Sequence, residues 1–399
     1  MAKKNNSIKY WLGQAHLWGG LVSGIVVFIV SITGCLFVFE EEIRNLTQQH
    51  YRFVEPQKTT RVKIATIKEV VEKEFPGKQI EQIRVFADAS RSTIVKLIDA
   101  KAKPQKGDKE KEYKKEAYAF NPYTGALLGR YNLEHDFMHI VEDMHKSLLL
   151  GEVGKWIIKV NIVVFFVMLL SGLYLWWPRK KNQRKFAFTI NVKSKFQVLN
   201  YSFHNVLGFY FLLPLLLITL TGIWWAIKPV QKLTYTALGE KLKEEKKLSS
   251  TYQEGKIFSS DMAFAKVSEQ YGGWQEAHIN VAKNKKEPVK VNLKYPYQIY
   301  KKSNVFEFDQ YSGEILKAEL YNDYKIADKI KHSNRDLHTG QNFGILGKLL
   351  AFFSSLFSAT LPITGFLIWY QRKYKKAPKK ALIPRKAAIS IARVNQVLQ

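Results

Sequence analysis

The chain has 399 residues, of which 46% are hydrophobic and 14% aromatic, and its formal net charge is +28. The basic excess does not indicate nucleic-acid binding, because the charges flank long apolar runs instead of lining a groove interleaved with aromatic residues. The single cysteine, Cys35, excludes an internal disulfide and a cysteine-based metal site.

Four long apolar runs predict four transmembrane helices, at residues 17–39, 156–177, 204–227 and 346–370. Each run is long enough to cross a hydrocarbon core of ~30 Å at ~1.5 Å per residue. Aspartate, glutamate and arginine are absent from all four runs. A helix in the core of a soluble protein is rarely so long and so uniformly apolar.

The distribution of charge predicts the orientation. Residues 1–16, 178–203 and 371–399 together carry 19 of the 62 Lys and Arg residues and no acidic residue. The positive-inside rule makes these three segments cytoplasmic, so we expect both termini inside. The two long loops, 40–155 and 228–345, are then expected outside the membrane.

Each outside loop is expected to contain a small α+β domain, with cores at residues 60–130 and 257–320. Apolar residues recur at helical spacing over 64–75 and 260–271. Alternating segments that predict strands follow, at 80–86, 93–98, 277–282, 289–295 and 297–300. Each core ends in a Tyr-Thr-Gly or Tyr-Ser-Gly turn between strand-like segments, which indicates a hairpin.

Histidines repeat in a fixed frame beside the apolar runs. His16 and His204 are each followed by a glycine after four residues and by a Thr-Gly pair after seventeen. His145 and His338 share a preceding aspartate, glycines after six and nine residues, and a Ser-Gly or Thr-Gly pair after 26. Residues 10–180 and 198–373 therefore form two parallel repeats. A repeat that keeps histidines beside membrane helices predicts cofactor ligands, and haem is the expected cofactor.

The topology restricts how these histidines can pair. His16 and His204 both open runs on the cytoplasmic side, whereas His145 and His338 both precede runs on the outer side. We therefore expect two bis-histidine b-type haems, one held by His16 and His204 and the other by His145 and His338. Two strong nitrogen ligands without an open position favour electron transfer over oxygen chemistry.

Further candidate residues leave alternatives open. Thr33, Thr221 and Thr364 either donate hydrogen bonds to a haem propionate or ring substituent, or bond back to carbonyls of their own helices. His139 and His332 lie six residues before the outer histidines. They either bind a further haem or the substrate iron, donate to the ligands, or lie at the surface.

The outer histidines also pose a geometric problem. A straight helix from His145 to Trp176 would run about 46 Å, more than the thickness of the membrane core. His145 therefore lies on an extension above the core, or the chain bends at Gly151 and Gly154. Other glycines beside the histidines are expected to admit a porphyrin or a neighbouring helix: Gly20, Gly24, Gly172 and Gly208.

The spans resemble the PepSY-associated transmembrane family. The similarity is carried by His16-Leu-Trp-Gly-Gly-Leu, Met144-His145-Lys-Ser-Leu-Leu-Leu-Gly151, Gly172-Leu-Tyr-Leu-Trp-Trp-Pro178, Leu337-His338-Thr-Gly340 and Thr364-Gly365-Phe-Leu-Ile-Trp369. The outside loops look like PepSY domains, with the Tyr-Thr-Gly and Tyr-Ser-Gly turns as their usual ending. The expected fold is four transmembrane helices in two parallel repeats, with two small PepSY-like periplasmic α+β domains.

The resemblance implies a function, because the family includes bacterial siderophore-iron reductases that use haem at the outer face of the inner membrane. We therefore expect a multi-pass, haem-dependent oxidoreductase of the bacterial cytoplasmic (inner) membrane. It would reduce a periplasmic ferric chelate (siderophore) and release ferrous iron for uptake. No catalytic residue is predicted beyond the haem ligands.

Partners follow from the same expectation. The cytoplasmic segments are too short for a flavin or nicotinamide domain, so a quinol or a cytoplasmic flavoprotein reductase must donate the electrons. Lipid is the other expected partner, and nucleic acid is not one.

Two alternatives stay open. The chain could be a haem-free regulator whose PepSY-like domains bind a peptide or protease, or a transport component for iron or siderophore. Against transport, the runs show no intramembrane acids and no broken helix that would line a substrate path.

Overall fold

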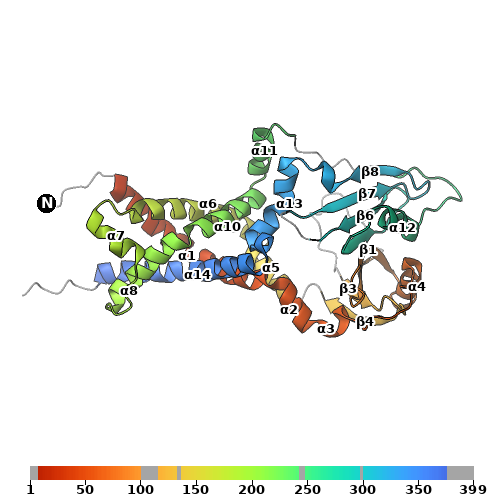
Figure 1. Cartoon of the computed structure of the whole chain (residues 1–399), viewed down its shortest axis with the longest axis horizontal. Helices are drawn as coiled ribbons and strands as arrows, with labels where there is room; N and C mark the ends of the chain where they lie inside the picture. The colour runs from red at the N-terminus through yellow and green to blue at the C-terminus, as the bar shows by residue number, and fades with distance from the viewer. Residues whose placement is uncertain (1–7, 100–115, 133–135, 242–247, 297–299, 375–399) are drawn as a thin grey trace, which may run out of the picture.

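The computed structural model of the chain describes residues 8–99, 116–132, 136–241, 248–296 and 300–374. A bundle of long apolar helices forms one end of the molecule, and a β-sheet with its covering helices forms the other (Figure 1). Residues 1–7 and 375–399 of the expected cytoplasmic termini lie outside the described part.

In the described residues, three bundle helices are long and apolar enough to cross a membrane: α1 (Ile8–Val38), α6 (Gly151–Trp176) and α14 (Gly344–Tyr374) with the turn before it. A fourth span is present in the described residues if two helical pieces, Phe196–Tyr210 and Leu212–Ala226, count as one.

These two pieces meet at an angle of 64°. The first comprises α8 (Phe196–Ser202), a π-helical turn η1 (Phe203–Leu207) and α9 (Gly208–Tyr210), and the second is α10 (Leu212–Ala226). Pro214 lacks the N–H that would bond to the Tyr210 carbonyl, which explains a break at this point. The expectation that no span is broken was therefore wrong, and Pro214 inside the apolar run was the signal.

Small residues set the packing of α1 on α14. The hydroxyl of Ser31 donates to that of Ser358 at 3.0 Å. A Cβ added at Gly24 would lie 3.0 Å from Cβ of Pro362. In lipid, apolar side chains gain little by meeting each other, so close approach of small residues is a common way to join helices. Large apolar side chains instead face outward, as Val22 and Leu213 do at 81% and 77% exposure.

Within the part of the chain that the structure describes, the sheet has eight antiparallel strands in the order β4-β3-β2-β1-β5-β6-β7-β8. Their bounds are β1 Lys78–Phe86, β2 Thr93–Asp99, β3 Glu116–Phe120, β4 Leu127–Asn132, β5 Glu276–Asn280, β6 Val289–Lys294, β7 Ser303–Phe308 and β8 Ile315–Glu319. The strand expected over 297–300 falls on residues of which 297–299 lie outside the described part.

The two expected α+β domains share this one sheet. β1 of the first loop pairs with β5 of the second, with Ile83 opposite Ile279. In the described residues, each half contributes four strands and one covering helix. The sequence predicts four strands in the first half but five in the second, and the additional one is the strand expected over 297–300. The sequence did not predict that the two halves join in one sheet. The backbone N–H and C=O groups at a strand edge can pair with any strand of suitable register, so they do not specify the partner.

Helices α4 (Ile64–Glu74) and α12 (Ser260–Gln270) cover one face of the sheet. The core beneath them is built from alternate strand residues, which include Ile83, Val95, Ile279, Val291 and Phe306. The carboxylate of Asp261 on α12 accepts the backbone N–H groups of Ile64 and Ala65 at 2.7 and 3.0 Å. The second half therefore caps the helix of the first.

Shorter helices connect the bundle to the sheet. Their bounds are α2 Glu40–Thr47, α3 Gln49–Arg52, α5 Phe137–Ser147, α11 Lys228–Ala237 and α13 Ile326–Thr339. Helix α7 (Lys181–Phe188) lies between α6 and α8, and the 3-10 turns η2 (Tyr321–Asp323) and η3 (Gln341–Phe343) flank α13.

The chain bends between each outer histidine and its span. After α5, the residues Leu148, Leu149 and Gly151 all have positive φ, at 52°, 58° and 55°. A Cβ at Gly154 would lie 1.6 Å from the carbonyl oxygen of Ser147, so this glycine lets the end of α5 rest on α6. Of the two arrangements expected for His145, the structure has the bend, and Gly340 and Gly347 repeat the contact in the second half.

Candidate cofactor sites

The first histidine pair lies in the bundle at the end far from the sheet. His16 projects from α1 and His204 from the π-helical turn η1, and their ring centroids are 6.5 Å apart with an interplanar angle of 86°. We call this pair the far site. It joins one histidine of the first repeat with its equivalent in the second.

The second pair lies where the bundle meets the sheet. His145 near the end of α5 and His338 near the end of α13 have ring centroids 6.2 Å apart and an interplanar angle of 81°. We call this pair the sheet-end site. The structure thus brings together the two pairs that topology and symmetry predict.

The spacing in both pairs fits one metal ion between two imidazoles. With metal–nitrogen bonds of about 2 Å, imidazoles on opposite sides of an ion have ring centres about 6 Å apart. Among the described residues, no three His, Cys, Asp or Glu side chains converge to hold a metal. This donor set, with two neutral nitrogens and no carboxylate, suits haem iron, for which the porphyrin supplies the other ligands.

Each histidine also contacts one hydroxyl through its Nδ1 nitrogen. The Nδ1–oxygen distances are 2.9 Å for His16 and Ser171, 2.8 Å for His204 and Thr364, 3.1 Å for His145 and Thr33, and 2.9 Å for His338 and Thr221. In every case the hydroxyl belongs to another helix of the same repeat. The four contacts therefore obey the twofold relation between the repeats.

These hydroxyls determine which imidazole nitrogen is free. Thr33 Oγ1 lies 2.8 and 3.0 Å from the carbonyl oxygens of Ile29 and Val30, and carbonyls can only accept. The single hydroxyl proton therefore goes to the helix, and Oγ1 accepts from Nδ1–H of His145. The lone pair of Nε2 is then left for a metal.

Of the two readings of the threonines, the structure shows the hydrogen bonds back to their own helices. Thr33, Thr221 and Thr364 bond back to their own helices, and the same oxygens also contact histidines. The role of Ser171 was missed from the sequence. Its signal was its place in the repeat, where it is equivalent to Thr364.

The glycine after each of these hydroxyl residues gives the imidazole room. A Cβ added at Gly172, Gly34, Gly222 or Gly365 would lie 3.2 to 3.6 Å from Cε1 of the neighbouring histidine. A side chain larger than a methyl group would displace the ring. The repeated Ser-Gly and Thr-Gly pairs are therefore histidine seats, in which one residue accepts the hydrogen bond and the next leaves space.

A cavity of about 710 Å³ opens at the far site and is lined by both of its histidines. This volume lies within the roughly 300–1,000 Å³ typical of ligand and cofactor pockets. Gly208 lines the cavity, and a Cβ there would meet no protein atom within 4 Å. Gly20 also lines the cavity and lies against Met168, whereas Gly24 packs against Pro362.

The cavity combines apolar walls with cations. Leu17, Phe165 and Leu212 are among its apolar residues, and the basic residues that line it are Lys9, Arg372 and Lys373. An apolar slot with positive charge at one part complements a flat ring system that carries carboxylates. The far site therefore fits haem in its ligands, its volume and its charge.

The sheet-end histidines are partly buried. Burial lowers the pKa of both His145 and His338 to about 4. Both imidazoles are therefore neutral near pH 7, which is the state that binds a metal. The ring of Trp225 lies 5.6 Å from that of His338 and adds an aromatic wall.

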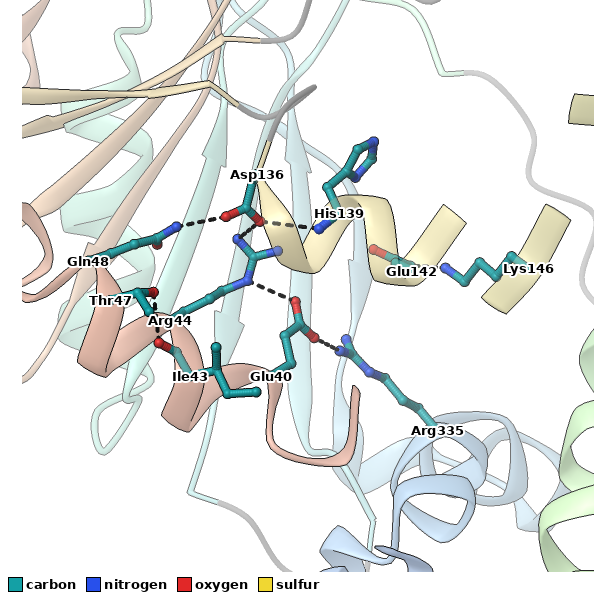
Figure 2. A network of polar contacts seen from close by, with 10 residues as sticks. All are labelled: Glu40, Ile43, Arg44, Thr47, Gln48, Asp136, His139, Glu142, Lys146 and Arg335. Carbon is teal, nitrogen blue, oxygen red and sulfur yellow. Dashed lines mark hydrogen bonds and ion pairs between the residues drawn. The ribbon is translucent and has the colours of Figure 1, made fainter. Parts of the chain in front are cut away.

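A chain of ion pairs holds the helices of the sheet-end site together (Figure 2). Glu40 on α2 contacts Arg44 at 3.1 Å and Arg335 on α13 at 2.9 Å. Arg44 in turn contacts Asp136 at 2.5 Å, and Asp136 accepts the backbone N–H of His139 as the N-cap of α5. These ion pairs, which we call the ion-pair relay, link the helices that carry His145 and His338 to α2, the helix that follows α1.

His139 and His332 occupy unlike surroundings. His139 is partly exposed, and its Nε2 lies 3.4 Å from Asp143 one turn later. The ring of His332 stacks on Tyr324 at 4.4 Å with an interplanar angle of 8°. Neither arrangement is that of the four seated histidines, so these two residues fit surface and packing roles best.

Comparison with known protein families identifies a match. A family model described as the PepSY-associated TM region matches residues 14–372, a range that includes both histidine pairs and both halves of the sheet. No curated protein matches the chain. Together with the apolar helices of the bundle, the match identifies a membrane protein.

Proposed function

The chain belongs to the PepSY-associated transmembrane family, and we propose that it is a di-haem reductase of the bacterial cytoplasmic membrane. It passes electrons across the membrane to a ferric chelate such as a siderophore, from which ferrous iron is released for uptake. In this proposal the bent helix pair is the third of four spans. The termini are cytoplasmic and the sheet is periplasmic, in keeping with the basic segments that flank the spans.

The observation that carries this proposal is the presence of two equivalent histidine pairs at opposite ends of one helical bundle. Their ring centroids lie 6.5 and 6.2 Å apart. A single histidine pair would suit a structural or sensory metal. Two histidine pairs, one at each end of the bundle, suit electron transfer between the ends.

Haem bound at each pair would supply one-electron redox chemistry. The residues of the chain would supply two histidine nitrogens at each site and would fix their orientation. His16 and His204 present Nε2 at the far site, and His145 and His338 do so at the sheet end. The hydroxyls of Ser171, Thr364, Thr33 and Thr221 hold the Nδ1 protons and keep the rings from turning.

The rest of the reaction needs a donor and an acceptor. Reduction of one ferric ion to ferrous iron consumes one electron, which a quinol or a cytoplasmic flavoprotein reductase would supply. The basic residues that line the far-site cavity, Lys9, Arg372 and Lys373, would supply positive charge to the carboxylates of a haem held there.

Proteoliposomes test this function. The protein would be inserted with quinol on one side and a ferric siderophore on the other, and ferrous iron would be trapped by a coloured chelator. We expect ferrous iron only with the electron donor, and less of it when either histidine pair is disrupted. Equal rates in wild type and in His16→Ala and His338→Ala variants would contradict the proposal.

Transport is a second candidate, because the 64° break between α9 and α10 resembles the discontinuous helices of transporters. In that case the chelate itself would enter the liposomes without any reductant. Uptake of radioactive iron that stays ferric would support transport over reduction.

A further inference from the structure

Two buried asparagines occupy equivalent places beside the histidines of the second repeat. Asn200 lies four residues before His204, and Asn334 lies four residues before His338. Only 6% of Asn200 and 3% of Asn334 is exposed. Because residues four apart share one face of a helix, each asparagine points to the same side as its histidine.

Both amides bind the threonine that seats the histidine. Nδ2 of Asn200 donates to the carbonyl oxygen of Thr364 at 3.1 Å, and Nδ2 of Asn334 donates to that of Thr221 at 3.0 Å. The hydroxyls of these same threonines contact His204 and His338. Each histidine helix of the second repeat is therefore held to its seat at two points.

The first repeat has apolar residues at the equivalent positions. Leu12 lies four residues before His16, and Val141 lies four residues before His145. Their side chains cannot donate to the carbonyls of Ser171 and Thr33. Among the described residues, the histidine from the second repeat therefore has an asparagine-to-threonine hydrogen bond beside its seat, and the histidine from the first repeat lacks this bond.

Packing alone does not require the asparagines. A buried amide costs free energy relative to an apolar side chain unless its hydrogen bonds are made. The first repeat has leucine and valine at these positions, and its histidine helices α1 and α5 form without an amide there. Asparagine at both positions of the second repeat, and at neither position of the first, points to a role in fixing the histidine.

We propose that Asn200 and Asn334 are positioning residues that make His204 and His338 the firmly held ligands of the two sites. His16 and His145 are then the ligands that detach first when a site is opened. This inference rests on the proposed haem function. It assigns the firmly held ligand of each site to the second repeat and the more easily detached ligand to the first.

The test measures haem retention without any assay of turnover. Purified full-length variants are mixed with excess apomyoglobin, and haem loss from each site is followed by reduced-minus-oxidised absorbance. His204→Ala is expected to lose the far-site haem, whereas His16→Ala keeps it with a single axial histidine and a high-spin spectrum. His338→Ala and His145→Ala should show the same contrast at the sheet end.

The asparagine variants carry the residues of the first repeat, Asn200→Leu and Asn334→Val. Loss of one buried hydrogen bond is expected to weaken haem retention at the affected site by roughly five- to tenfold. In the background of Asn200→Leu, the contrast between His16→Ala and His204→Ala should shrink. The other haem of the same molecule shows that the variant is folded, because each asparagine contacts only one site.

The outcomes separate this inference from the proposed function. If the wild type holds two haems but His16→Ala and His204→Ala lose haem equally, the inference is wrong and the proposed function stands. If Asn200→Leu leaves haem retention and the contrast unchanged, the inference is likewise wrong. Absence of haem from the wild type contradicts both.

Discussion

His145 is oriented by Thr33, whose Oγ1 lies 3.1 Å from its Nδ1 nitrogen across the boundary between α5 and α1. The threonine proton goes to its own helix, so the imidazole must donate at Nδ1 and keep Nε2 as an acceptor. The same relation recurs at His338, His16 and His204. A residue far along the chain thus sets the chemical state of each histidine.

Replacing this hydroxyl is expected to loosen the sheet-end site. Thr33→Val keeps the shape of the side chain but removes the acceptor for His145. Loss of such a supporting contact weakens metal binding by roughly 10- to 100-fold, which haem titration of the apoprotein would measure. Thr219→Val is the control, because Thr219 is equally buried and its hydroxyl contacts Leu215 of its own helix at 2.6 Å. Similar haem affinity in both variants would show that the Thr33 hydroxyl does not support His145.

The bend after α5 predicts a strong effect of a single methyl group. In Gly154→Ala the new Cβ would overlap the carbonyl oxygen of Ser147, 1.6 Å away. Relief requires α5 to move off α6, and overpacking of this kind costs about 1–3 kcal/mol. Thermal unfolding should show a lower midpoint, accompanied by loss of the sheet-end haem. Gly272→Ala serves as control, because no atom lies within 4 Å of its added Cβ.

The ion-pair relay predicts a defect confined to one end of the bundle. Glu40→Gln removes the charge between Arg44 and Arg335, two contacts of 3.1 and 2.9 Å. Because Glu40 is largely buried, we expect a loss of about 1–3 kcal/mol in the free energy of unfolding. Haem retention should fall at the sheet end and stay unchanged at the far site. Glu72→Gln, which affects an exposed pair with Lys68, should change neither.

The union of the two sheet halves predicts that Asp261 stabilises a helix of the other half. Asp261→Ala leaves the N–H groups of Ile64 and Ala65 without their acceptor, at a cost of about 1–2 kcal/mol. Hydrogen exchange should rise in α4, on the first half of the sheet. Ser259→Ala removes the cap of α12 alone and should leave exchange in α4 unchanged. If hydrogen exchange in the Asp261 variant increased only in α12, Asp261 would not act as a cap of α4.

Much of this architecture could be predicted from the sequence because it rests on periodic signals. The apolar runs, the basic flanks and the repeated histidine frame predict the bundle and the pairing of His16 with His204 and of His145 with His338. The helix at Ile64–Glu74 and the strands that follow it also agree with the pattern. These features depend on local hydrophobicity or on symmetry, which a single chain displays.

Other features depend on contacts that a sequence does not specify. β1 pairs with β5 through its edge, and the alternation of apolar and polar residues along β1 does not determine which strand it pairs with. The roles of Asn200 and Asn334 appear only when their amides reach Thr364 and Thr221 across the bundle. The break at Phe211 had a signal in Pro214, but proline inside a membrane helix is often tolerated, so the signal was ambiguous.

The central claim is that two histidine pairs hold two haems, and an absorbance spectrum of the purified protein with and without dithionite tests it most directly. We predict a reducible b-type signal that corresponds to about two haems per chain. The His16→Ala and His338→Ala variants should each alter one haem and leave the other as in the wild type. A protein purified from haem-replete cells with no reducible haem signal would contradict the account.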